Sequence, residues 1–461
     1  MALAASRQQA ASRPRLLQAV FDAVQQPDIR KKLLFTGMIL VIFRFIAHIP
    51  IPNADPTLLQ DALENNELIN LFNLFSGGAL LQLSIASLGV YPYITASIIM
   101  TLVTPMIPQL QSLRQEGEQG RHRIELYQHW MTVPLAFIQG YAQLVILEQS
   151  ISGVAPGALQ FSPSLTGEDA LPTITALFAL TAGTMFLVWL GELITENGIG
   201  NGISIIIFGG IVAGLPALLS RVFDSTIGMF GVILLAVLAV ALVAAIVFMQ
   251  EATRKIPVQY AKSVFRAGKM YRQSGQSHIP LRVNSAGMIP LIFAYSIVIL
   301  PVTIAQFMLD SSETPWVRDT ARFFVDVLGP GTGAGGSGAS PGFYILVFVL
   351  VVLFSFFYTL VVFQQQNLAE NLQKQGGFVP GIRPGRPTAE YIMRVLVRIT
   401  WAGALFLGFV AILPYLVTNW FDITSLTISS TGMLIVVGVV LDTMKQLEAQ
   451  LLMRNYEGFI R

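Results

Sequence analysis

Apolar stretches of about 20 residues recur along the whole chain, and polar segments separate them. A helix of that length covers the hydrocarbon core of a bilayer, so this pattern indicates membrane-spanning helices. We therefore predict an all-α, polytopic membrane protein. Ten spans are expected at 33–51, 81–108, 126–147, 171–194, 203–220, 228–249, 286–308, 343–363, 393–418 and 425–444.

Composition supports a membrane protein and excludes several kinds of chemistry. Of the 461 residues, 54% are hydrophobic and 12% are charged, about half the charged fraction of a soluble domain. The chain has no cysteine and only four scattered histidines, so we expect neither a disulfide nor a metal site. It contains no Walker loop and no hydrolase nucleophile motif. We therefore expect no cofactor and no enzymatic activity.

The distribution of basic residues orients the spans. If the N-terminus is cytoplasmic, 24 of the 28 Lys and Arg residues fall on the cytoplasmic side. Cytoplasmic segments of membrane proteins carry such an excess, so we expect both termini in the cytoplasm. Two long basic loops, 250–284 and 364–392, lie on this side. Such loops bind anionic lipid, ribosomal RNA or an acidic protein surface, or they serve only to orient the chain.

A short half-apolar segment, residues 68–76, precedes the second span. It contains Leu71, Phe72, Asn73, Leu74 and Phe75 and is too short to cross a bilayer. An asparagine surrounded by lipid would be costly. The segment therefore lies either in a protein-lined or watery space, or at the membrane interface as an amphipathic helix.

A few polar side chains fall at membrane depth. Arg44 lies within the first span and Asn284 at the start of the seventh, and such residues usually face the interior of a bundle. Thr95 and Gln139 could hydrogen-bond to Asn284 if their helices meet. The spans hold no Asp/Glu pair for proton relay, which disfavours an ion-coupled transporter.

Three runs of the sequence are distinctive: Asn73–Leu80 (NLFSGGAL), Gly191–Ile207 (GELITENGIGNGISIII) and Phe378–Gly385 (FVPGIRPG). Together with the number of spans and the loop lengths, they resemble the SecY family, the channel-forming subunits of the bacterial Sec protein translocase. The resemblance covers essentially the whole chain. It implies a protein-conducting channel that passes unfolded secretory chains and releases signal or transmembrane segments sideways into the bilayer.

The resemblance also implies an architecture. Two inverted five-helix halves, 33–220 and 221–444, would enclose a central pore, with a cytoplasmic segment 1–32 before them and a cytoplasmic tail 445–461 after them. The segment at 68–76 would be a short plug helix, formed by Leu71, Phe72, Asn73, Leu74 and Phe75.

Functional residues follow from matching the family motifs position by position. A ring of aliphatic side chains would close the waist of the pore: Val90, Ile94, Ile203, Ile207, Ile292 and Ile435. A polar cluster at the lateral gate would comprise Thr95, Gln139 and Asn284. The basic loops would dock a motor or a ribosome through Arg383, Lys269, Arg266, Pro384 and Gly385.

The implied partners are small SecE-like and SecG-like membrane subunits, the SecA motor ATPase, the ribosome, signal peptides, nascent chains and anionic lipids. The implied location is the bacterial inner membrane, with a thylakoid membrane as the alternative. A secondary transporter for a small solute, built on an inverted repeat, is the competing function. It would need a polar site at the midplane, where the family pattern places an aliphatic ring.

Overall fold

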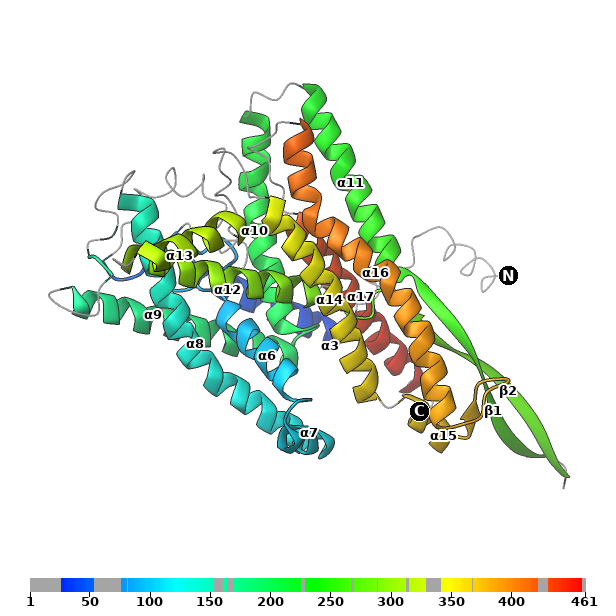
Figure 1. Ribbon diagram of the computed structural model, residues 1–461. Helices are drawn as coiled ribbons and strands as arrows, with labels where there is room; N and C mark the ends of the chain where they lie inside the picture. The colour runs from blue at the N-terminus through cyan, green and yellow to red at the C-terminus, as the bar shows by residue number, and fades with distance from the viewer. Residues whose placement is uncertain are drawn as a thin grey trace, which may run out of the picture. The chain divides into compact units, whose positions relative to one another are not determined.

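The computed structural model describes residues 26–53, 76–80, 82–152, 159, 161–163, 169–224, 229–266, 269–287, 289–311, 315–328, 341–366, 368–421 and 430–457. Helices dominate these residues (Figure 1). The longer ones are α3 (Pro27–Ile46), α6 (Tyr91–Val103), α8 (Glu118–Ser152), α9 (Ala170–Asn197), α10 (Gly202–Asp224), α11 (Met229–Glu251), α12 (Ile289–Ser311), α13 (Pro315–Leu328), α14 (Pro341–Gln366), α16 (Arg386–Phe421) and α17 (Ser430–Glu457). Two short helices are α7 (Pro108–Gln115) and α15 (Leu368–Lys374).

Every predicted span falls on one of these helices, but the helices differ in how apolar they are. Within the described residues, four stretches are long and apolar enough to cross a membrane: Ala170–Asn197, Val232–Glu251, Gly342–Lys374 and Arg386–Leu413. The apolar parts of α10 and α12 are shorter, Gly202–Pro216 and Ile289–Val298. Several apolar spans are thus confirmed, and the crossing of the bilayer by all ten helices stays a prediction.

The second predicted span, 81–108, is not one continuous helix. Turns precede α6, and Gly89 in the left-handed region (φ +58°) allows the last of them. After Val103 the chain bends by 103° into α7, which begins at Pro108. Proline is well suited to the first position of a helix because its missing N–H needs no partner there. The helical part of this predicted span is therefore α6, a short helix of 13 residues that is followed by a sharp bend.

The expectation of an all-α fold is wrong in the first basic loop. Thr253–Arg266 form strand β1 and Lys269–Arg282 form strand β2, paired antiparallel along their whole length. Ile256 and Val258 are buried, whereas Lys255 and Pro257 between and beside them are exposed. This alternation is the pattern of a strand with one buried face.

A third strand joins the two basic loops. Strand β3 (Gly377–Phe378) pairs with β1 at Gln259 and Tyr260, which gives the strand order β2-β1-β3. The buried side of this sheet packs against α15 and the beginning of α16. The residues of this core are Ile256, Val258, Leu281, Leu372, Val379, Ile392 and Leu396.

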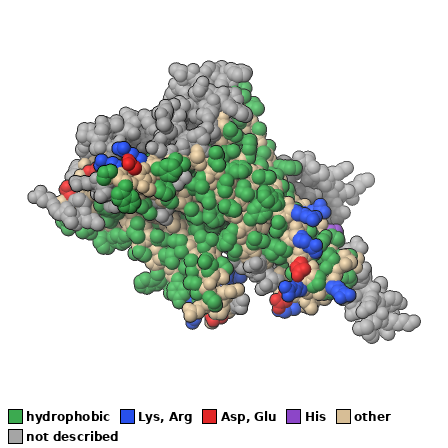
Figure 2. Space-filling view, viewed as in Figure 1, with side chains coloured by type: hydrophobic (Ala, Val, Ile, Leu, Met, Phe, Trp, Pro, Cys, Tyr) green, Lys and Arg blue, Asp and Glu red, His purple; other side chains and the backbone are tan. Residues whose placement is uncertain are grey.

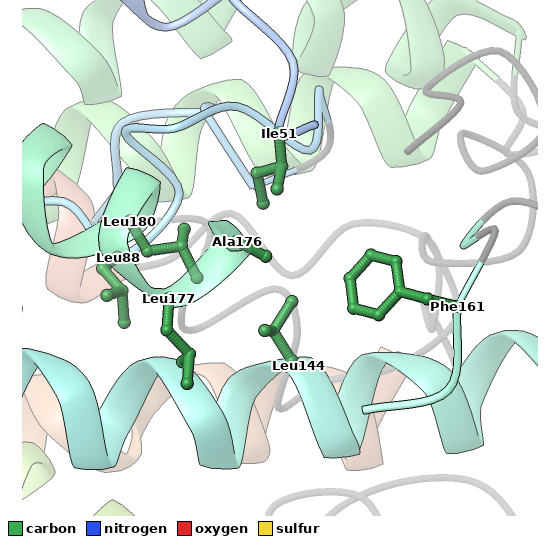
Figure 3. Close-up of a cluster of buried hydrophobic side chains, with 7 residues drawn as sticks. All are labelled: Ile51, Leu88, Leu144, Phe161, Ala176, Leu177 and Leu180. Atoms are coloured by element: carbon green, nitrogen blue, oxygen red, sulfur yellow. The ribbon is translucent and has the colours of Figure 1, made fainter. Parts of the chain in front are cut away.

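The contacts divide the chain into two compact units. The first unit comprises Met1–Arg221, Pro301–Gly331 and Gly438–Arg461, and the second comprises Val222–Leu300 and Thr332–Val437. The sheet core belongs to the second unit. In the first unit, α8 and α9 enclose a separate core with the turn before α6 (Figure 3). Its buried members are Ile51, Leu88, Leu144, Phe161, Ala176, Leu177 and Leu180.

Candidate functional site

Two predicted ring residues lie at the start of α6. Val90 is the N-cap residue of this helix, and its carbonyl accepts a hydrogen bond from the Ile94 amide at 3.0 Å. The two side chains are therefore one helical turn apart. Val90 is 1% exposed and Ile94 is 8% exposed. Both offer branched aliphatic groups without hydrogen-bonding capacity.

Two further ring residues, Ile203 and Ile207, lie in the first turns of α10. Ile207 is buried and Ile203 is partly buried. The start of α10 is capped by Asn201, whose side-chain oxygen accepts a hydrogen bond from the Ser204 amide at 3.1 Å. The Gly202 amide donates to the Thr195 hydroxyl at 2.9 Å, which ties the helix start to α9. The position of both isoleucines is therefore well defined.

Close approach of α9 and α10 explains two glycines of the long motif. A Cβ added to Gly191 would lie 2.9 Å from Cγ1 of Ile203, and one added to Gly202 would overlap the Gly191 carbonyl. Only residues without a side chain allow the backbones to come this near. The glycines of the Gly191–Ile207 run thus allow α9 and α10 to pack closely, and this packing positions Ile203 and Ile207.

The last two ring residues belong to the second unit. Ile292 lies on α12 and is 6% exposed, and Ile435 lies on α17 and is fully buried. The closure of all six residues into one ring stays a prediction.

The predicted plug residues 71–75 lie outside the described residues, but the turn that follows them is described. Gly77 and Gly78 both have positive φ, +68° and +86°. The Nη1 group of Arg44 donates a hydrogen bond to the Gly77 carbonyl at 3.2 Å. Arg44, a charged residue within the first predicted span, therefore has a backbone partner inside its unit, as expected for such a group.

The same turn touches α10. A Cβ added to Gly77 would lie 2.6 Å from Cα of Gly210 and 3.0 Å from Cζ of Phe43. The converse Cβ on Gly210 would overlap Gly77. The turn that follows the predicted plug is thus packed backbone to backbone against the helix that carries Ile207.

Two of the three predicted gate residues are joined. The Nε2 group of Gln139 on α8 donates to the Thr95 hydroxyl at 3.3 Å, and that hydroxyl donates to the Tyr91 carbonyl at 3.0 Å. Asn284 is 8% exposed and belongs to the second unit. Its participation in the cluster stays a prediction.

The tip of the second basic loop is an ordered turn. Gly381 and Gly385 adopt φ values of +82° and +99°, and the Thr388 hydroxyl donates to the Arg383 carbonyl at 2.8 Å. Val379 is buried in the sheet core, whereas Arg383 is exposed. The loop therefore fixes the backbone of Arg383 while its guanidinium faces outward. Pro384 is exposed beside it.

The other predicted docking residues lie at the tip of the hairpin. Arg266 ends β1 and pairs in register with Lys269, which begins β2. Because β3 pairs with β1, the hairpin and the Arg383 loop are parts of one sheet rather than two separate loops. Figure 2 shows Lys and Arg side chains gathered over α15 and the adjoining part of α16, next to a largely hydrophobic surface.

One polar contact was not predicted from the sequence. Nε2 of His129 on α8 lies 2.6 Å from a carboxylate oxygen of Glu192 on α9, and Nδ1 lies 2.7 Å from the Glu125 carbonyl. No local pattern signals this pair, because 63 positions separate the two residues.

The fold is shared with solved channel structures. One, described as the structure of a protein conducting channel, has a TM-score of 0.59 at 17% identity and covers 92% of this chain and 93% of that one. Another, concerned with the plug domain of SecY and the closed state of the channel, has a TM-score of 0.61 at 17% identity over the same shares. The chain thus has the fold of these solved channels.

Sequence comparison then identifies the family. The SecY family profile matches residues 84–444. The protein translocase subunit SecY of Streptomyces lividans is 42% identical over 458 residues, which are 97% of this chain and 100% of the relative. The corresponding subunit of Mycobacterium leprae is 37% identical over 460 residues with the same shares. The chain belongs to the SecY family. It is a channel subunit of a bacterial protein translocase, not an enzyme.

Proposed function

We propose that the chain forms the passive path through which unfolded secretory polypeptides cross the bacterial inner membrane, and from which signal and transmembrane segments leave sideways into the bilayer. Both termini would be cytoplasmic. Ten spans in two inverted five-helix halves would surround the pore, with the segment at 68–76 as its plug. An inverted repeat with an odd number of spans per half agrees with both termini being on one side.

The observation that carries this proposal is the aliphatic character of the ring positions. Val90, Ile94 and Ile207 are buried and branched, and none offers a hydrogen bond. A constriction of such side chains expels water when it is empty and so blocks ions. It can still part around a polypeptide, because it holds no polar group that would bind the passing backbone. A small-solute site would require polar groups at this place.

Energy for transport would come from partners. The ordered loop tip with its exposed Arg383 supports docking of the SecA motor or of the ribosome, since a guanidinium forms forked pairs with carboxylates and phosphates. One solved structure that shares the fold is described as Sec61 in a ribosome-channel complex, with a TM-score of 0.58 at 18% identity. SecE-like and SecG-like subunits and anionic lipids would complete the assembly.

Crosslinking of a stalled translocation intermediate tests the proposal. A photoreactive residue would replace Ile94 or Ile207 in turn, and Val240 on α11, which is 71% exposed, would serve as the lipid-facing control. We expect both ring positions to crosslink to the stalled secretory chain and position 240 to crosslink only to lipid. Crosslinking of the chain at position 240, with none at 94 and 207, would contradict the proposed path.

A further inference from the structure

Helix α13 lies between the seventh and eighth predicted spans and has three distinct faces. Ala321 and Val325, one turn apart, are buried against Ala305 at the end of α12. On a second face, Trp316 and Phe323 are two turns apart and are 72% and 62% exposed. Because Ala321 and Val325 are buried, α13 is packed against α12. Trp316 and Phe323 are therefore exposed on a helix that is held in place.

The arginines of α13 lie away from the aromatic face, whereas the exposed Asp319 lies at its margin, about 60° from Trp316 and about 40° from Phe323. With about 100° of rotation per residue, Arg318 is about 160° from Trp316, and Arg322 is about 160° from Phe324. Both arginines are exposed. Figure 2 shows charged side chains along one edge of this helix and hydrophobic side chains beside them. Helix α13 therefore presents an aromatic edge and an arginine edge on opposite sides, and the docked Val325 lies next to the arginine edge, about 20° from Arg318.

Helix α12 also carries exposed apolar side chains near the place where α13 docks. Ile304 and Met308, next to the docking position of α13, are 51% and 41% exposed. This part of α12 ends a predicted span, so in the proposed topology these side chains would face lipid where the hydrocarbon core gives way to the headgroups. Tryptophan is enriched at that depth, and helices with one apolar and one charged face lie in the plane of the interface.

We infer that α13 binds the lipid bilayer itself, lying along the interface with Trp316, Phe323 and Phe324 inserted below the headgroups and the arginines facing the water. The surface would hold the end of α12 at a fixed depth through the Ala305 contact. The inference rests on the proposed membrane topology, in that α12 must cross the bilayer. It goes beyond the conduction of polypeptides, because it assigns a lipid-binding surface outside the pore.

Fluorescence depth measurement tests the inference in the complete chain, reconstituted into vesicles of phosphatidylethanolamine and phosphatidylglycerol. A variant that retains only Trp316 would have its other tryptophans replaced by Phe. The acyl chains would carry bromine either near the headgroup or near the terminal methyl. We expect stronger quenching of Trp316 by the shallow bromines and protection from aqueous acrylamide. Phe323→Asp should reduce the bromine quenching severalfold, whereas Arg318→Gln on the opposite edge should leave it unchanged.

A variant that retains only Trp401 provides the topological control. Trp401 lies on α16 within a predicted span and is 52% exposed, so the deep bromines should quench it. If acrylamide quenches Trp316 and neither brominated lipid does, while the lipids quench Trp401, the inference is overturned and the proposed topology stands. Stronger quenching of Trp316 by the deep bromines would also overturn it. Lack of lipid quenching at Trp401 would contradict the topology, and the inference would fall with it.

Discussion

Gly210 offers the sharpest test of how the pore is sealed. It faces Gly77 so closely that neither residue has room for a side chain, and Gly77 also holds a positive φ that disfavours other residues. Gly77 directly follows the predicted plug. We predict that Gly210→Ala pushes the turn at Gly77 away from α10 and unseats the plug, so that the resting channel conducts ions.

The size of the effect follows from the geometry. A Cβ on Gly77 would lie 2.6 Å from Gly210, and one on Gly210 would lie closer still, whereas ordinary contact begins at 3.4 Å. The turn must therefore retreat by at least about 0.8 Å, which close packing does not absorb freely. Added methyl groups in packed sites cost about 1–3 kcal/mol. If the open state relieves this cost, the open population rises about 5- to 150-fold.

Conductance of the purified channel in planar bilayers measures this population. Gly214→Ala is the matched control, because it lies one turn further along α10 and a Cβ there meets nothing within 4 Å. We expect the resting conductance of Gly210→Ala to exceed that of the wild type and the resting conductance of Gly214→Ala to equal it. Both variants should be equally stable toward extraction in detergent. Equal resting conductance of Gly210→Ala and the wild type would refute the seal.

Three further predictions concern the predicted site residues. Joint replacement of Ile203 and Ile207 by Gly should make the resting channel leak ions in the same bilayer assay, because a wider and wetter constriction no longer excludes water; an unchanged conductance would remove both from the ring. Asn284→Leu should shift the gate equilibrium by about 0.6–2 kcal/mol, the range for interhelical hydrogen bonds, and so change secretion of a precursor with a defective signal sequence; secretion at the wild-type level would make Asn284 merely structural. Arg383→Glu should abolish SecA-driven translocation into inverted vesicles with unchanged topology by protease mapping, and Arg383→Lys should fall in between; normal translocation by the Glu variant would exclude docking through Arg383.

The helices could be predicted because the length of each apolar run matches the length of a membrane-spanning helix. All ten predicted spans overlap helices of the structure. Gly89 and Pro108 are sequence signals for the irregular start and the bent end of the second span. The apolar run in which they lie nevertheless favoured a single span. The hairpin was not predicted because its many basic residues are equally typical of a cytoplasmic loop, although Ile256 and Val258 occupy alternate positions. That alternation is a signal from which the strand could have been found.

Contacts between distant residues could not be predicted from local pattern. The glycines of the long motif indicated close packing, but only the structure shows that Gly191 meets Gly202 and that Gly77 meets Gly210. The sequence led us to expect that Thr95 and Gln139 hydrogen-bond to Asn284 if their helices meet. The structure instead joins Gln139 to Thr95, a bond that was not predicted, and the bonds to Asn284 stay a prediction. The roles of the ring residues came from resemblance to a family, since an isolated isoleucine carries no functional signal of its own.

Import into vesicles tests the central account most directly. The chain would be reconstituted with a SecE-like subunit and supplied with SecA, ATP and a secretory precursor. We predict that the unfolded precursor becomes protected from added protease, and that a precursor locked in its folded state by a crosslink does not. Failure to protect the unfolded precursor in vesicles that do accumulate a small solute against its gradient would contradict a protein-conducting channel and favour a transporter.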